Sequence, residues 1–129
     1  MRIKAYSVVA VICGALVLAG VAWAKGWVTR VTIHQGTKMS LHGRVYSSSP
    51  KCRAGRTIEV FRETGHVQNP RKDKLVGKTT SKPFSQFFAV WSGITAPHPG
   101  AYYARATRHV LPSGRVCLAG NSRTIFVTR

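Results

Sequence analysis

The chain has 129 residues, and its 20 lysines and arginines outnumber its 3 acidic residues, so its formal net charge is +17 at pH 7. Acid–base catalysis by carboxylates needs two acidic side chains within reach of one substrate. Glu59 and Glu63 would be about 13 Å apart on one strand that rises about 3.3 Å per residue, and Asp73 falls in an expected loop. This composition disfavours a glycosidase-like enzyme, and we expect a protein that is not an enzyme.

The N-terminal segment 1–24 has the pattern of a secretory signal. Arg2 and Lys4 form a short positive region, and an apolar run follows them. The residues that match a signal-peptidase site, with small side chains at its −3 and −1 positions, are Ala22, Ala24 and Lys25. We expect a signal helix that is cleaved, which would place the protein outside the cell or in the cell envelope. The run is also about 20 residues long, so an uncleaved single-pass anchor with the domain outside is the alternative.

Residues 25–129 suit a single domain and are too few for two. They contain two cysteines, Cys52 and Cys117, and export favours a disulfide between them. Closing a loop of roughly 65 residues would stabilise the domain by about 4 kcal/mol in the chain-entropy model. Two buried free thiols are the alternative.

Seven short stretches in this domain show the two-residue alternation of β-strands. Their ranges are 27–34, 39–46, 56–63, 75–81, 84–91, 102–109 and 123–128. Turn sequences such as Gln35-Gly36-Thr37 separate them, and no amphipathic helix follows residue 24. This spacing predicts an all-β, seven-stranded Greek-key β-sandwich, with a small barrel as the alternative.

The expected strand 39–46 contains a glycine at a core position. Leu41, Gly43 and Val45 alternate on one face, and Gly43 there predicts a bulge or a close backbone contact. The side chains that alternate on the opposite face are Ser40, His42, Arg44 and Tyr46.

The expected strand 102–109 follows a proline- and glycine-rich loop and should be central in the sandwich. Tyr102, Ala104 and Ala106 are predicted to face the core, where a bulky side chain from another strand would fill the space above the alanines. The side chains predicted on the opposite face are Tyr103, Arg105, Thr107 and His109. Trp91, on an earlier strand, is expected to pack in the core beside the disulfide.

Five motifs occur in the order found in one family of small domains. They are 41–45 (LHGRV), 56–61 (RTIEVF), 76–81 (VGKTTS), 88–90 (FAV) and 99–102 (PGAY). In this order the chain resembles the carboxypeptidase regulatory-like, or transthyretin-like, β-sandwich modules, which are Ig-like. It differs from them at 82–86 (KPFSQ), where such modules usually have an acidic, glycine-containing turn. Small secreted actinobacterial proteins with one disulfide are also similar. The resemblance implies a non-catalytic accessory or binding module. We also expect no cofactor.

The five histidines are scattered, and no sequence spacing brings two of them together as ligands, so we expect no metal site. Arginine and tyrosine side chains are better candidates, because Arg105 can pair with an anion and Tyr103 can stack on it. The residues predicted to form this anion-binding patch are Tyr103, Arg105, Arg108, His109 and Arg123. An ordinary solvated sheet face is the alternative. Two further basic clusters, 51–56 around Cys52 and 71–74, are interpreted as solvated loops.

The charge of the domain indicates the class of partner. Without Arg2 and Lys4, eighteen basic residues remain against three acidic ones, a net charge of +15. Such a surface attracts polyanions at low salt. We expect the partner to be an acidic polymer of the cell envelope or an anionic lipid surface, and no specific nucleic acid. The alternatives are a surface without a ligand, and an assembly module that contacts a surface protein through Phe87 and Trp91.

Overall fold

The structure is a computed structural model that describes residues 26–129. The expected signal segment and its cleavage site lie outside the described residues. The strands of the described part are β1 (Gly26–Trp27), β2 (Arg30–Val31), β3 (His34–Gln35), β4 (Ser40–Tyr46), β5 (Thr57–Arg62), β6 (Lys74–Thr80), β7 (Lys82–Pro83), β8 (Phe88–Thr95), β9 (Gly100–Ala106), β10 (His109–Val110), β11 (Val116–Cys117), β12 (Gly120–Asn121) and β13 (Ile125–Val127). Two short 3-10 helices, η1 (Thr37–Met39) and η2 (Pro50–Cys52), complete the described elements. None of the helices within 26–129 is long and apolar enough to cross a membrane.

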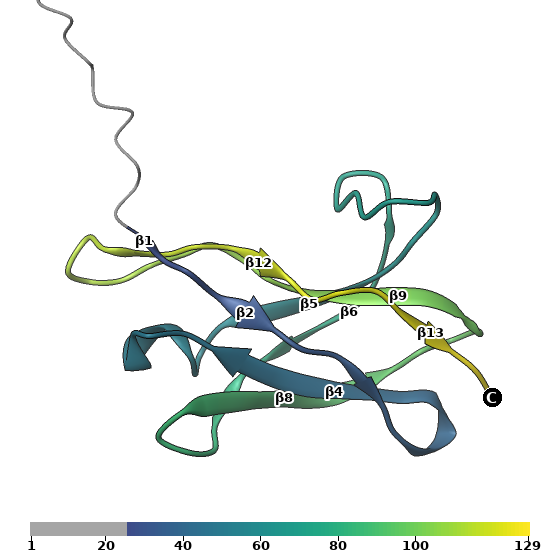
Figure 1. The fold of residues 1–129 in the computed structure, drawn as a ribbon, viewed down its shortest axis with the longest axis horizontal. Coiled ribbons are helices and arrows are strands. Elements are labelled where there is room, and N and C mark those ends of the chain that lie inside the picture. The colour runs from purple at the N-terminus through teal and green to yellow at the C-terminus, as the bar shows by residue number, and fades with distance from the viewer. Residues whose placement is uncertain (1–25) are drawn as a thin grey trace, which may run out of the picture.

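The strands form two stacked layers, as expected for a sandwich (Figure 1). One layer, the β4–β8 sheet, has the order β2–β4–β8–β7, and β3 also pairs with β4. The other layer, the β5–β9 sheet, has the order β12–β9–β5–β6, and β13 also pairs with β9. A smaller sheet, β1–β11–β10, extends from one end. Between β6 and β7 the chain passes directly from one layer to the other, because only Ser81 separates these strands.

The core fills the space between the two layers. Tyr102, Ala104 and Ala106 of β9 are fully buried in it, as their alternation predicts. Trp91 of β8 is the largest buried side chain of the same core. The Tyr102 hydroxyl donates to the His98 carbonyl at 2.6 Å, which fixes the turn into β9.

The expected strands 27–34 and 84–91 differ from the observed ones. The first is divided, because β1 pairs with β11 whereas β2 and β3 pair with β4. The second begins four residues later, at Phe88, and continues to Thr95. Residues 84–87, which precede β8, form a turn. The Ser85 hydroxyl holds it by accepting hydrogen bonds from the backbone N–H groups of Phe87 and Phe88.

The predicted disulfide joins Cys52 to Cys117, with the two Cα atoms 5.5 Å apart. It lies in a small cluster at the end of the sandwich, where Leu111 and Trp27 pack against it. The prediction that Trp91 packs beside the disulfide is wrong. Trp91 belongs to the main core, because β8 is a central strand of its sheet whereas the disulfide connects η2 to β11.

Arg56 corrects the interpretation of 51–56 as a solvated basic loop, because its side chain is fully buried. Its guanidinium group donates to the Thr29 hydroxyl and the Cys52 carbonyl at 2.8 and 2.9 Å. It also donates to the carbonyls of Thr107 and Leu118 at 2.7 and 3.0 Å. Burial lowers the pKa of Arg56. This one side chain therefore connects four segments near the disulfide.

Candidate anion-binding groove

Tyr103 is fully buried, which corrects the prediction that its ring is available for stacking on an anion. The ring stacks on Phe61 with the centroids 5.4 Å apart, and the hydroxyl donates to Asp73 Oδ2 at 2.5 Å. The two-residue alternation of β9 correctly predicts that Tyr103 points away from the main core. The loop between β5 and β6 folds over that face and covers the ring, which a strand pattern does not reveal.

Asp73 holds this covering loop in place. Its carboxylate accepts hydrogen bonds from the backbone N–H groups of Thr64 and Asn69 at 3.0 and 2.6 Å, and from the Thr64 hydroxyl at 3.2 Å. Burial alone would raise the pKa of Asp73, but these bonds and the bond from Tyr103 outweigh it, and the pKa lies below its ordinary value. Burial and the neighbouring carboxylate raise the pKa of Tyr103.

The other residues of the predicted patch lie apart from one another. Arg105 is half-buried, and its Nη1 donates to Asn121 Oδ1 at 2.6 Å. Arg123 is exposed and lines, together with Asn121, a shallow hollow of about 300 Å³. Arg108 and His109 are exposed, and His109 belongs to β10 in the smaller sheet. Arg105 and Arg123 thus share Asn121 as a neighbour, whereas Arg108 and His109 follow the end of β9, where His109 pairs with Cys117.

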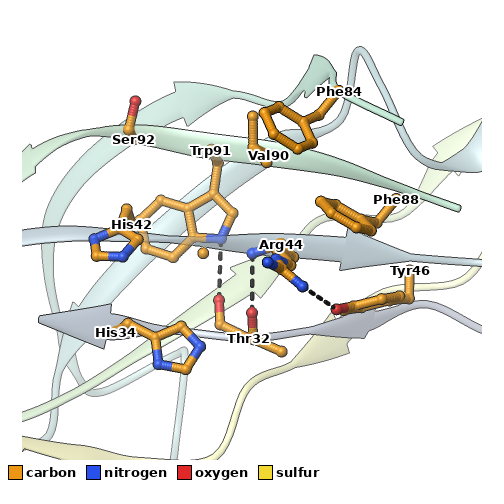
Figure 2. A pocket seen from close by; sticks show the side chains of 11 residues that line it. Thr32, His34, His42, Arg44, Tyr46, Phe84, Phe88, Val90, Trp91 and Ser92 are labelled. Atoms are coloured by element: carbon orange, nitrogen blue, oxygen red, sulfur yellow. Dashed lines mark hydrogen bonds between the residues drawn. The ribbon is translucent and has the colours of Figure 1, made fainter. Parts of the chain in front are cut away.

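A groove of about 530 Å³ lies on the outer face of the β4–β8 sheet (Figure 2). Its lining includes two histidines, an arginine and three aromatic side chains, which are His34, His42, Arg44, Tyr46, Phe84 and Phe88. Three of these come from β4 at alternate positions, because successive outward residues of a strand point to the same side. The two-residue alternation of 39–46 predicts which side chains of β4 lie on this face. It does not predict that β2, β3 and β8 are the strands beside β4.

An arginine–aromatic stack runs from the groove into the neighbouring hollow. It consists of Phe84, Phe88, Arg44 and Tyr46, which line the groove, and Arg30, which lines the hollow beside Arg123. Arg30 Cζ lies 4.4 Å from the Tyr46 ring centroid, and Arg44 Cζ lies 4.2 Å from the Phe88 ring centroid. The Phe84 and Phe88 rings stack with their centroids 5.4 Å apart. Arg44 Nη1 also donates to the Tyr46 hydroxyl at 3.2 Å (Figure 2). Cation–π contacts of this kind hold the guanidinium planes in fixed positions.

The floor of the groove depends on the predicted close contact at Gly43. A Cβ atom at this position would overlap the Thr32 carbonyl, which accepts a hydrogen bond from Trp91 Nε1 at 3.1 Å. The β4–β8 register shifts between Leu41 and Gly43, as a bulge requires. The Thr32 hydroxyl accepts the backbone N–H of Arg44 at 2.9 Å (Figure 2). The glycine therefore allows β2, β4 and β8 to meet beneath the groove.

The two layers differ in charge. None of the five strands of the β4–β8 sheet contains an acidic residue. All three carboxylates belong to the side of the β5–β9 sheet: Glu59 forms an ion pair with Lys78 at 3.7 Å, Glu63 accepts a hydrogen bond from Thr124, and Asp73 lies before β6. In the part of the chain that the structure describes, no carboxylate therefore neutralises Arg30 or Arg44.

Comparison of the chain with protein-family models, with curated proteins and with solved structures gives no match. Within residues 26–129, no group of three or more histidine, cysteine or acidic side chains is placed to hold a metal ion. The groove offers the exposed ring of Phe84 and guanidinium N–H groups without acidic partners. This combination can pair with anionic groups while it packs against a flat apolar face.

Proposed function

We propose that the protein is an exported, non-catalytic β-sandwich domain that binds an acidic, sugar-containing polymer of the cell envelope in the groove of the β4–β8 sheet. The observation that carries the proposal is the arginine–aromatic stack on a face without carboxylates. Arginine pairs with carboxylate or phosphate groups through two parallel hydrogen bonds. The Phe84 ring, which is 69% exposed, offers an apolar surface for the C–H face of a sugar ring, whereas Tyr46 and Phe88 are half-buried between their stacking partners. A polymer that carries both anionic groups and sugar rings would contact the arginines and the aromatic side chains of the stack together.

Electrostatics supports the same ligand class. The domain without the signal segment has a net charge of +15, and its acidic residues lie on the sheet opposite the groove. A polymer with repeated negative charge would be attracted to the whole domain and held most tightly where arginines are not neutralised. The expected partners outside this class, anionic lipid and a surface protein, have weaker support from the groove.

The fold class that we propose is an Ig-like Greek-key sandwich, to which the transthyretin-like modules are similar. The sheet orders β2–β4–β8–β7 and β12–β9–β5–β6 support it, because Ig-like domains have the same division of strands between their two sheets. The hydrogen bond from Tyr102 to His98 also supports it, since Ig-like domains have a tyrosine at this corner. Membership of the carboxypeptidase regulatory-like family remains a prediction from the five motifs.

Export and location are proposed on two grounds. The pattern of residues 1–24 predicts a signal segment or an anchor. The disulfide between Cys52 and Cys117 is stable in oxidising compartments and rare in reducing ones. Both observations support a location outside the cell or in its envelope.

An assembly module that contacts another protein is the second candidate function. Of the two aromatic residues expected to make that contact, Trp91 is buried and unavailable. Phe87 is 65% exposed and Phe84 is 69% exposed, in the turn between β7 and β8. This function would give a defined complex in crosslinking that the substitution Phe87→Ser abolishes and a high salt concentration leaves intact.

Titration with three polymers tests the proposed function. Polygalacturonate carries sugar rings and carboxylates, polyphosphate carries charge alone, and dextran carries sugar rings alone. We expect polygalacturonate to bind most tightly, and its dissociation constant to rise about tenfold or more between ~50 mM and ~500 mM salt, because salt screens charge pairs. Equal binding of dextran, or polygalacturonate binding that salt does not change, would contradict the proposal.

A further inference from the structure

Two histidines that lie eight positions apart in the sequence meet at one end of the groove. His34 of β3 is the direct partner of His42 of β4 in the antiparallel ladder. Their rings have centroids 5.9 Å apart and an interplanar angle of 35°. Figure 2 shows both rings on the same side of these neighbouring strands. The sequence prediction that no two histidines come together is therefore wrong, because it considered spacing along the chain and not pairing across a hairpin.

We propose that His34 and His42 form a two-histidine site for a divalent transition metal ion such as Cu²⁺, Ni²⁺ or Zn²⁺. A metal ion about 2.1 Å from a ring nitrogen lies about 3.2 Å from the ring centroid, so two rings that share one ion have centroids about 5 to 6 Å apart. The observed 5.9 Å falls in this range. Small rotations of the exposed side chains would direct one nitrogen of each ring to a common point.

The surroundings leave the imidazole nitrogens accessible. Both histidines are exposed, and no hydrogen bond of either ring occurs among the described contacts. A Cβ atom at Gly36 would lie 3.5 Å from His42 Nδ1, so the glycine leaves that approach clear. The Arg44 guanidinium, the nearest cation on the same strand face, is directed towards Tyr46 and Phe88 and away from the two rings (Figure 2).

The ligand set indicates which ions bind. Neutral imidazole suits Cu²⁺, Ni²⁺ and Zn²⁺, whereas Mg²⁺ and Ca²⁺ prefer oxygen ligands. All three side-chain carboxylates belong to the opposite layer, so the two rings supply the side-chain ligands and water or a bound molecule occupies the remaining positions. Cu²⁺ should bind most tightly, as it does to most nitrogen ligands. The site does not depend on the proposed binding of a polymer.

Isothermal titration of untagged full-length protein with CuCl₂, NiCl₂ and ZnCl₂ tests the site. We expect one ion per chain, with Cu²⁺ bound more tightly than Ni²⁺ or Zn²⁺. His34→Asn and His42→Asn should each weaken binding about tenfold or more, because each removes one of two ligands. The matched control is His66→Asn, which removes an exposed histidine from the covering loop and should leave the affinity unchanged.

Two results would overturn the proposal. One is a pair of folded His34→Asn and His42→Asn variants that bind the ions as tightly as the parent protein. The other is an equal loss in His66→Asn, which would show that exposed histidines bind metal independently. The electron paramagnetic resonance spectrum of the Cu²⁺ complex gives a second reading, since the proposed site requires coupling to two imidazole nitrogens in the parent and to one in each variant.

Discussion

Asp73 should contribute more to stability than any other acidic side chain of this domain. Its two carboxylate oxygens accept four hydrogen bonds, two at Oδ1 and two at Oδ2. The substitution Asp73→Asn replaces one oxygen with an amide nitrogen that cannot accept. One backbone N–H then loses its acceptor, the hydroxyl at the same position can only reverse and accept from the neutral amide, and the remaining bonds lose their charged acceptor. A hydrogen bond to a charged group contributes about 1.5 to 3 kcal/mol. We therefore expect Asp73→Asn to lower the free energy of unfolding at pH 7 by about 3 kcal/mol or more.

The dependence of this effect on pH follows from the lowered pKa of Asp73. A carboxyl group with a lower pKa in the folded state stabilises the protein fully above its unfolded pKa of about 3.9. That contribution is lost as the pH falls through the folded pKa. The difference in stability between parent and Asp73→Asn should therefore be constant from pH 5 to pH 7 and shrink below about pH 4.

Urea unfolding followed by tryptophan fluorescence at several pH values measures both quantities. Glu59→Gln is the matched control, because the one contact given for the Glu59 carboxylate is a long ion pair of 3.7 Å with Lys78, whose side chain is 60% exposed, although Glu59 itself is half-buried. Its loss should cost less than about 1 kcal/mol. Equal destabilisation by the two substitutions, or a difference for Asp73→Asn that does not change between pH 7 and pH 3, would refute the reasoning.

Two further predictions concern the end of the sandwich near the disulfide. Replacing both Cys52 and Cys117 with serine opens a loop with a sequence separation of 65 residues. The free energy of unfolding, measured by urea titration, should then fall by about 4 kcal/mol. An unchanged value would mean that the disulfide hardly restricts the unfolded chain. Arg56→Met leaves one hydroxyl and three carbonyl acceptors without their donor and should cost about 3 kcal/mol or more in the same assay, whereas a neutral result would mean that water replaces the guanidinium.

Several elements of the fold could be predicted from single-strand patterns. The alternation of Tyr102, Ala104 and Ala106 indicates the core face of β9, and all three are buried. The cysteine count and the secretory pattern predict the disulfide that the structure contains. These predictions succeed because each depends on one periodicity or on one pair of residues, and not on which strands are neighbours.

The candidate sites depend on such neighbours, and the sequence could not indicate them. The alternation of β9 predicts that Tyr103 faces away from the main core, which is correct, but a polar loop anchored by Asp73 covers the ring and buries it. The arginine–aromatic stack depends on the registers of three strands, which pair Tyr46 with both Arg30 and Phe88 and leave Phe88 diagonally across from Arg44. The outward alternation of β4 was the one signal in the sequence for this groove.

The measurement that tests the proposed function most directly compares two double variants with the same loss of charge. Arg30→Gln with Arg44→Gln removes both guanidinium groups of the arginine–aromatic stack, whereas Arg71→Gln with Lys72→Gln removes two exposed charges from the covering loop. Polygalacturonate should bind the groove variant about tenfold more weakly than the loop variant, because charge-assisted hydrogen bonds act only at contact. Equal losses in the two variants would contradict a binding site in the groove and would show that net charge alone attracts the polymer.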